Sequence, residues 1–246
     1  MNNLSPGKVL YGRVILISGA GGGLGSVAAK ACAAAGACVV LLDKAVSPME
    51  KLYDEILAAG HTQPAIYPLD LDKATEADYA ELADILNSQF GLLHGLLHSA
   101  ADLGVLEPLA DIKSGQWDRL LRINLSAAQG LTRAVLPLLQ RAGDASVVFT
   151  SNSSARLGKA YWGAYGVADI ALEGMARMWA DELASAGLVR VNIFVPGPVN
   201  SPSRRKTHPG ELPDENPVPE SLVARYTYMF GPESLGINGQ IIEGPV

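Results

Sequence analysis

The 246-residue sequence has little cysteine, no excess of basic charge and no apolar run long enough to cross a bilayer. Its two cysteines, Cys32 and Cys38, lack metal-ligand spacing, so we expect neither a disulfide framework nor a metal site. The formal net charge of −6 argues against nucleic acid and membrane partners, because both need clustered lysine and arginine. The first residues carry no signal-peptide pattern, and we therefore expect a cytoplasmic protein.

Short apolar runs alternate with longer segments of helical periodicity along nearly the whole chain. Such alternation is typical of parallel strands joined by helical crossovers. It predicts an α/β fold, a single Rossmann-type doubly wound parallel sheet of about seven strands with helices on both faces. The expected strands span 13–18, 37–42, 65–69, 92–98, 146–151, 189–195 and 240–243, and the expected helices span 25–35, 48–59, 76–89, 116–140 and 163–186.

A glycine-rich turn from Gly19 to Gly25 lies between the first expected strand and the first expected helix. Glycine lets the backbone turn tightly and approach a pyrophosphate, whose charge is held by free N–H groups at the helix N-terminus. A purely structural turn is the alternative, but the position between strand and helix favours a dinucleotide site. The candidate cofactor contacts in this turn are Gly19, Gly22, Gly23, Leu24 and Gly25.

The second expected strand leads to Asp43, eighteen residues beyond Gly25. A carboxylate at this point accepts hydrogen bonds from the adenosine ribose hydroxyls and repels a 2′-phosphate. No lysine or arginine lies within the glycine turn, although Lys44 follows the acid directly. The sequence therefore predicts NAD as the cofactor and makes NADP the less favoured choice; an ordinary solvated acid is the alternative for Asp43.

The spacing of Gly19, Gly23 and Gly25 resembles that of the short-chain dehydrogenase/reductase family, and the likeness continues in order along the chain. The resemblance implies one dinucleotide-binding domain over 1–246, assembled as a homodimer or homotetramer through the long helix at 163–186. It also implies hydride transfer between nicotinamide and a small alcohol or carbonyl substrate. The further cofactor positions that it implies are Asp70, Leu71, Ala100, Pro196, Gly197 and Val199.

The positions that resemble the family's catalytic residues depart from its pattern. Tyr165 looks like the catalytic tyrosine and Asn124 matches the family's asparagine, but Asn152 stands at the serine position and Asp169 at the lysine position. An ionised acid disfavours the phenolate that the lysine would favour. Asparagine can still donate to a carbonyl oxygen, and a one-residue register shift would restore a serine. Asp169 with a raised pKa is a further possible acid.

Two functions therefore stay open at the level of the sequence. The first is an NAD-dependent oxidoreductase with the catalytic residues Tyr165, Asn124, Asn152 and Asp169. The second is a catalytically impaired NAD-binding pseudoenzyme with a regulatory or scaffold role. Residues for holding the cofactor follow the family pattern more closely than residues for moving protons.

Three remaining features of the sequence give weaker indications of function. The proline-rich stretch at 196–220 predicts a loop over the substrate region, either an exposed loop or a mobile lid. Its basic run, Arg204 to Lys206, is read as a solvated surface or as an anion contact. His94 and His98 lack a third ligand nearby in sequence, so no metal site is expected.

Overall fold

Seven parallel strands form one sheet at the centre of the protein, in a computed structural model that describes residues 8–212 and 214–244. The strand order is β3-β2-β1-β4-β5-β6-β7, so the winding reverses between β1 and β4. In open α/β sheets, ligands bind beside such a reversal at the carboxyl ends of the strands. The strands are β1 (Val14–Ser18), β2 (Cys38–Asp43), β3 (Ala65–Pro68), β4 (Gly95–His98), β5 (Ala145–Thr150), β6 (Val189–Val195) and β7 (Ile241–Glu243).

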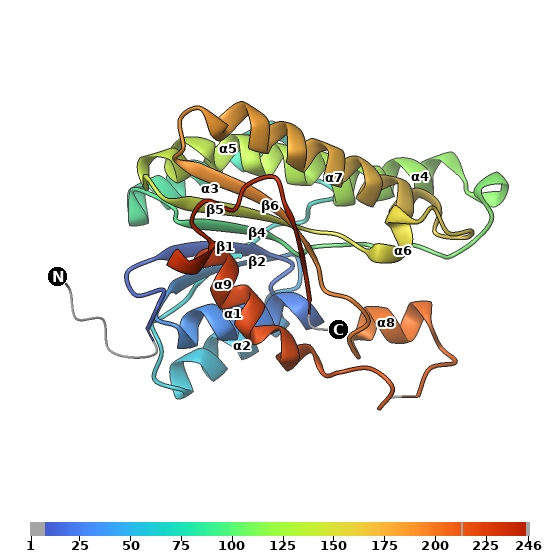
Figure 1. The fold of residues 1–246 in the computed structure, drawn as a ribbon, viewed down its shortest axis with the longest axis horizontal. Helices are drawn as coiled ribbons and strands as arrows, with labels where there is room; N and C mark the ends of the chain where they lie inside the picture. Colours follow the sequence, from blue (N-terminus) through green and yellow to red (C-terminus); the bar gives the residue numbers. More distant parts are fainter. Residues whose placement is uncertain (1–7, 213, 245–246) are drawn as a thin grey trace.

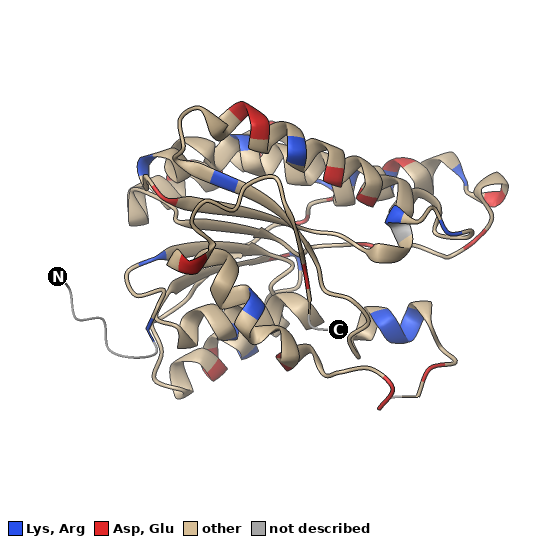
Figure 2. Ribbon diagram, in the orientation of Figure 1, with Lys and Arg blue, Asp and Glu red and all other residues tan. Residues whose placement is uncertain are grey.

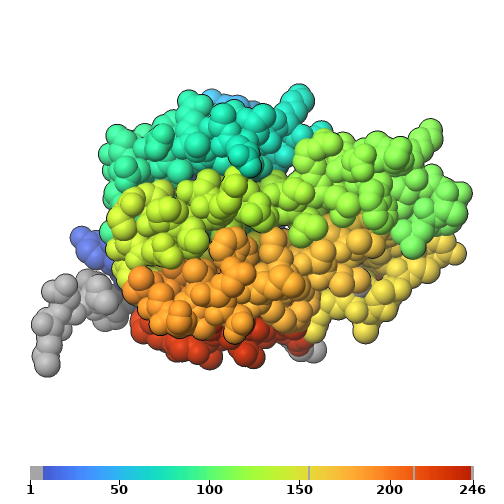
Figure 3. All heavy atoms as spheres, turned by 90° about the horizontal axis from the view of Figure 1, so that it is seen from above, coloured from blue at the N-terminus to red at the C-terminus, as the bar shows by residue number. Residues whose placement is uncertain are grey.

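Helices cover both faces of the sheet and give the molecule three layers (Figure 1). One face carries α1 (Gly23–Ala34), α2 (Val46–Ala58) and α9 (Val223–Phe230). The other face carries α3 (Glu76–Phe90), α5 (Ala127–Arg141) and α7 (Gly163–Ala184), which run side by side in Figure 3. Within the described ranges, no helix has the length and apolar character needed to span a membrane.

The helix α1 packs closely on the sheet because its inward side chains are small. Ala28, Ala29 and Cys32 are fully or almost fully buried against the apolar strands. Burial raises the pKa of the Cys32 thiol to about 12, so this residue is a small apolar core side chain. The start of α1 is therefore held firmly at the carboxyl end of β1.

The fold predicted from the sequence is confirmed: the seven expected strands and five expected helices all occur, with ends displaced by a few residues. The strand expected over 92–98 begins only at Gly95. The helix expected over 116–140 is divided into α4 (Ser114–Leu121), a π-helical turn called η2 (Arg122–Ser126) and α5. A π turn inside a helix often marks a functional site, and this one contains Asn124.

The proline-rich stretch at 196–220 is not loop throughout, and the sequence prediction is wrong over the short helix α8 (Pro202–Thr207). The Ser201 hydroxyl accepts a hydrogen bond from the Arg204 backbone N–H and so caps this helix. Pro202 is compatible with a first helical turn because its missing N–H has no partner there. The remaining short elements are η1 (Leu109–Asp111), α6 (Ser153–Arg156), η3 (Pro219–Leu222) and η4 (Pro232–Ser234).

Candidate functional site

A cavity of about 500 Å³ opens at the carboxyl ends of the strands, beside the reversal of strand order. It extends from the glycine turn to the start of α7. Every residue that the sequence singled out for the cofactor or for catalysis lines this cavity: Gly19, Gly22, Gly23, Leu24, Gly25, Asp43, Asp70, Leu71, Ala100, Asn124, Asn152, Tyr165, Asp169, Pro196, Gly197 and Val199.

The glycine turn has a backbone that only glycine allows. Gly19 has φ +70°, and a Cβ there would lie 2.6 Å from the Ala100 backbone. A Cβ at Gly25 would lie 2.1 Å from the Gly19 carbonyl oxygen. The following helix α1 starts without a side-chain cap and without an acid in its first turn. Its first N–H groups are therefore donors without intrahelical partners at the cavity wall, and the turn fits a diphosphate.

Asp43 directs its carboxylate at the protein's own backbone. One oxygen accepts a hydrogen bond of 3.1 Å from the Gly21 N–H, and the other accepts one of 3.0 Å from the Ala45 N–H. Its neighbour Lys44 lines the same end of the cavity. The acid therefore shapes the turn, and a cation is available next to it.

Asn124 holds the loop that follows β4. Its Oδ1 accepts a hydrogen bond of 2.8 Å from the Asp102 N–H, and its Nδ2 donates one of 2.8 Å to the Asp102 carbonyl. The side chain is 5% exposed, and both halves of its amide are used on the backbone. Asn124 thus positions the cavity wall.

Tyr165 lies in the first turn of α7, and its hydroxyl interacts with the side chains of both Asn152 and Asp169. The Oδ1 of Asn152 accepts a hydrogen bond of 2.7 Å from the Ser154 N–H, which leaves the NH₂ group for the tyrosine. Ser151 instead donates to Glu173, at 2.7 Å. Asn152, and not Ser151, therefore contacts the tyrosine.

Burial dominates the electrostatics of this cluster. It raises the pKa of Tyr165 well above its usual range, and the adjacent Asp169 raises it further. Burial also raises the pKa of Asp169, with the negative neighbour Glu173 adding to the shift. Both groups therefore favour their neutral forms.

His98, at the end of β4, also lines the cavity. Its ring stacks on Phe149 with centroids 4.6 Å apart, and its Nε2 lies 2.8 Å from the Thr132 hydroxyl. Burial lowers its pKa to about 3, so the imidazole is neutral. His94 accepts a hydrogen bond from the Val14 N–H. Across residues 8–212 and 214–244, no group of three or more potential ligands is placed to hold a metal ion.

The sequence placed the 196–220 stretch over the substrate region, but it did not predict the helix α8 within it. A Cβ at Gly23 would lie 2.7 Å from Pro202, so the helix begins against the glycine turn. Beyond its other end, His208 lies 6.2 Å from the Trp162 ring, near Tyr165. The basic helix visible in Figure 2 thus contributes to the lining of the cavity. Two features of the sequence could have predicted this helix: the Ser201-Pro202 pair at its start and the basic run from Arg204 to Lys206. The lining residues from α8 and its cap are Ser201, Ser203, Arg204, Lys206 and Thr207.

Comparison with known proteins gives consistent matches. The family model of short chain dehydrogenases matches residues 13–212. The uncharacterized oxidoreductase YciK of Escherichia coli K12 is 34% identical over 226 residues, which cover 92% of this chain and 89% of YciK. The solved structure of a candidate short chain dehydrogenase from Pseudomonas syringae is 43% identical, has a TM-score of 0.94 and is matched over 98% of its length and 99% of this chain.

The expectation of NAD is wrong in the light of two further solved structures. A candidate short chain dehydrogenase from Shigella flexneri 2a is complexed with NADP; it is 33% identical, with a TM-score of 0.93 over 96% of this chain and 98% of its own. A candidate from Escherichia coli CFT073 is complexed with NADPH, at 33% identity, a TM-score of 0.92 and the same coverage. The physical reason lies in Asp43, whose carboxylate is turned to backbone N–H groups.

Proposed function

Because the chain belongs to the short-chain dehydrogenase family, we propose that it is an NADP-dependent oxidoreductase that transfers hydride between nicotinamide and a small alcohol or carbonyl compound. The observation that carries the proposal is the position of Tyr165 beside Asn152, in the same cavity as the uncapped start of α1. One cavity therefore unites a phosphate cradle with a proton donor.

The glycine turn would hold the cofactor through its diphosphate. The N–H groups at the start of α1 provide donors and a partial positive charge. Lys44 would meet the 2′-phosphate that distinguishes NADP, because it lines the cavity directly after β2. Asp43 supports this arrangement because its carboxylate accepts hydrogen bonds from the Gly21 and Ala45 N–H groups and so fixes the backbone on both sides of this part of the cavity.

The catalytic step needs a proton as well as a hydride. When bound, the reduced nicotinamide supplies the hydride to the carbonyl carbon. Tyr165 donates the proton to the carbonyl oxygen, and the Asn152 NH₂ group holds the tyrosine oxygen in place. Asn124 keeps the loop after β4 in position through both of its hydrogen bonds to Asp102. A positioned proton donor of this kind contributes roughly 10²–10⁴-fold in rate.

The alternative of a cofactor-binding pseudoenzyme receives no support from the comparisons, in which YciK is an oxidoreductase. A homo-oligomer, a cytoplasmic location and a single domain over 1–246 remain predictions. The exposed apolar side chains of Ile170 and Met178 on α7, 49% and 66% exposed, support assembly through this helix.

The proposal is tested by following NADPH oxidation with a panel of small ketones and aldehydes. The Tyr165→Phe variant removes the proton donor and is expected to lower kcat by about 10²–10⁴-fold, while the Kd for NADPH stays unchanged. The matched control is Tyr161→Phe, because Tyr161 is 61% exposed and precedes the same helix. Equal turnover by the Tyr165→Phe variant, or failure of the wild type to bind NADPH, would refute the proposal.

A further inference from the structure

Asp169 lies one helical turn after Tyr165 on α7 and is only 4% exposed. Its carboxyl group interacts with the Tyr165 hydroxyl. The Oδ2 atom of this carboxyl is buried and has no hydrogen-bond partner among the described residues. A buried carboxyl with an unpartnered oxygen at the wall of the cavity requires an explanation.

The charged groups around Asp169 do not favour a carboxylate. On its own helix it faces Tyr165 on one side and the acid Glu173 on the other. The cation from α6, Arg156, lies 3.3 Å from Glu173, and Arg177 lies 3.1 Å from the same acid. Arg156 also approaches Glu243 of β7, at 3.8 Å. Both nearby arginines are thus paired with Glu173 rather than with Asp169.

An ionised Asp169 would be a buried charge next to the acid Glu173, and its Oδ2 would have no hydrogen-bond partner among the described residues. Such a charge is strongly unfavourable unless it is paired and fully hydrogen-bonded. A hydrogen bond from the Tyr165 hydroxyl lowers the pKa of Asp169, but burial outweighs it. A neutral carboxylic acid needs only one acceptor for its proton, and the oxygen of the adjacent Tyr165 hydroxyl can accept it. Burial and the lack of a paired cation among the described residues therefore favour a protonated Asp169 beside Tyr165.

We propose that Asp169 is a protonated carboxylic acid that returns a proton to Tyr165 when the tyrosine protonates the product oxygen during carbonyl reduction. This inference rests on the proposed function of the same cavity. It gives Asp169 a role that a merely structural hydrogen bond would not have, because the acid would be a second proton donor in line behind the tyrosine.

The proton count balances without a further reactant. The carbonyl carbon gains the hydride of the reduced cofactor, and the carbonyl oxygen gains the hydroxyl proton of Tyr165. The Oη–H bond of Tyr165 breaks and is remade with the proton of Asp169, whose O–H bond breaks. Asp169 is left as a carboxylate and takes a proton from water after the alcohol leaves. The reverse reaction needs Asp169 to start as the carboxylate, so reduction and oxidation have opposite pH dependence.

The protonation state of Asp169 can be measured without turnover. In the infrared difference spectrum of wild type minus Asp169→Asn at neutral pH, without cofactor, a carboxylic-acid C=O band is expected. The control is Asp181→Asn, which changes an exposed acid on the same helix. This variant should keep the band, so the difference spectrum of wild type minus Asp181→Asn should not show it. A pH-difference spectrum of the wild type alone gives the same information if the variant does not fold. Absence of the band in both spectra would overturn the proposal.

Kinetics then tests whether the proton is used. The Asp169→Asn variant keeps the size and a hydrogen bond of the side chain but has no acidic proton. NADPH-dependent reduction at neutral pH is expected to fall at least about tenfold, near the lower end of what a proton-transfer group contributes, with an unchanged KM for NADPH. The wild-type rate should decline as the pH rises through the titration seen in the infrared, and this decline should be absent in the variant.

The two proposals fail in distinguishable ways. A wild-type rate and pH profile in the Asp169→Asn variant would refute the role of Asp169 while leaving the proposed function intact. Absence of turnover in wild type that binds NADPH and shows the infrared band would refute the proposed function, and the role of Asp169 with it.

Discussion

Two aspartates at opposite ends of the sheet show how neighbours decide what a carboxyl group does. Asp144 precedes β5 at the amino ends of the strands, and Asp169 lies at the carboxyl ends. Burial tends to raise the pKa of Asp144, but hydrogen bonds and charges from Arg13 and Arg190 hold it below its usual range. Burial raises the pKa of Asp169, and no cation among the described residues pairs with it to oppose the shift. The first acid is structural, and the second retains a proton.

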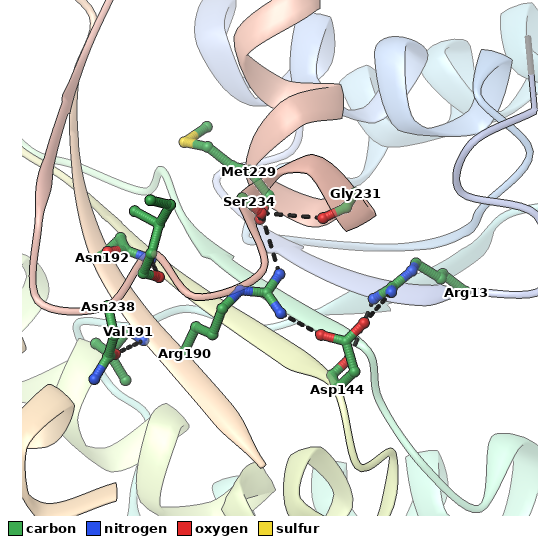
Figure 4. Close-up of polar contacts among 10 residues, drawn as sticks. Arg13, Asp144, Arg190, Val191, Asn192, Met229, Gly231, Ser234 and Asn238 are labelled. Carbon is green, nitrogen blue, oxygen red and sulfur yellow. Dashed lines mark hydrogen bonds and ion pairs between the residues drawn. The ribbon is translucent and has the colours of Figure 1, made fainter. Parts of the chain in front are cut away.

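The amino-end cluster joins segments far apart in the sequence (Figure 4). The Asp144 carboxylate forms ion pairs with Arg13, which directly precedes β1, and with Arg190 of β6. Arg190 also donates to the Ser234 hydroxyl at 3.2 Å, and Ser234 donates to the carbonyls of Met229 and Gly231. The cluster ties β1, β5 and β6 to the end of α9, away from the cavity.

The largest expected difference between the two ends is in stability. Asp144→Asn leaves Arg190, whose side chain is 8% exposed, without its anion, so the free energy of unfolding should fall by about 3 kcal/mol. Denaturant unfolding measures this change. The kcat of the folded fraction should be unchanged, because the cluster does not line the cavity. A loss of kcat at full folding would show that the two ends are coupled.

An intermediate effect is expected from the cofactor end of the cavity. Lys44→Ala removes the cation proposed to meet the 2′-phosphate, which should weaken NADPH binding about tenfold, or about 1.4 kcal/mol. Calorimetric titration with NADPH and with NADH separates the loss of the 2′-phosphate contact from a general loss of cofactor binding, since the affinity for NADH should not change. The matched control is Lys30→Ala, on the exposed side of α1. Equal weakening of both cofactors would contradict the assignment.

The smallest effect is a difference in the pH dependence of stability. The lowered pKa of Asp144 gives stability that is present above the unfolded-state pKa and lost as the pH falls through the folded value. The raised pKa of Asp169 works in the other direction: the folded state is penalised as the pH rises from the unfolded-state pKa toward the folded one. Asp169→Asn should therefore stabilise the protein by on the order of 1 kcal/mol, more so at higher pH.

Thermal melts of the two Asn variants across pH measure this contrast. Asp144→Asn should reduce the loss of stability on acidification, whereas Asp169→Asn should reduce the loss on the alkaline side. If stability varied with pH in the same way in both variants, Asp144 and Asp169 would have the same protonation behaviour. That result would contradict the contrast between the two ends of the sheet.

Much of the cofactor half of the site could be predicted because its signals are local. Within the turn from Gly19 to Gly25, the backbone approaches at Gly19 and at Gly25 are ones that a Cβ would block. The resemblance of spacing also selected Asn152 and Tyr165, which the fold brings together although they are thirteen residues apart. The cofactor was predicted wrongly because the partners of Asp43, the N–H groups of Gly21 and Ala45, depend on how the turn folds.

The sequence by itself determined the parallel α/β sheet, the phosphate-binding turn and the residues that gather at the carboxyl ends of the strands, because apolar periodicity and glycine sterics act over short stretches of chain. Only the tertiary structure decided that residues 202–207 form a helix at the cavity wall and that Arg156 and Arg177 pair with Glu173 rather than with Asp169. Protonation and hydrogen-bond choice depend on burial and on charges from distant segments. The chain sets these quantities only when those segments meet.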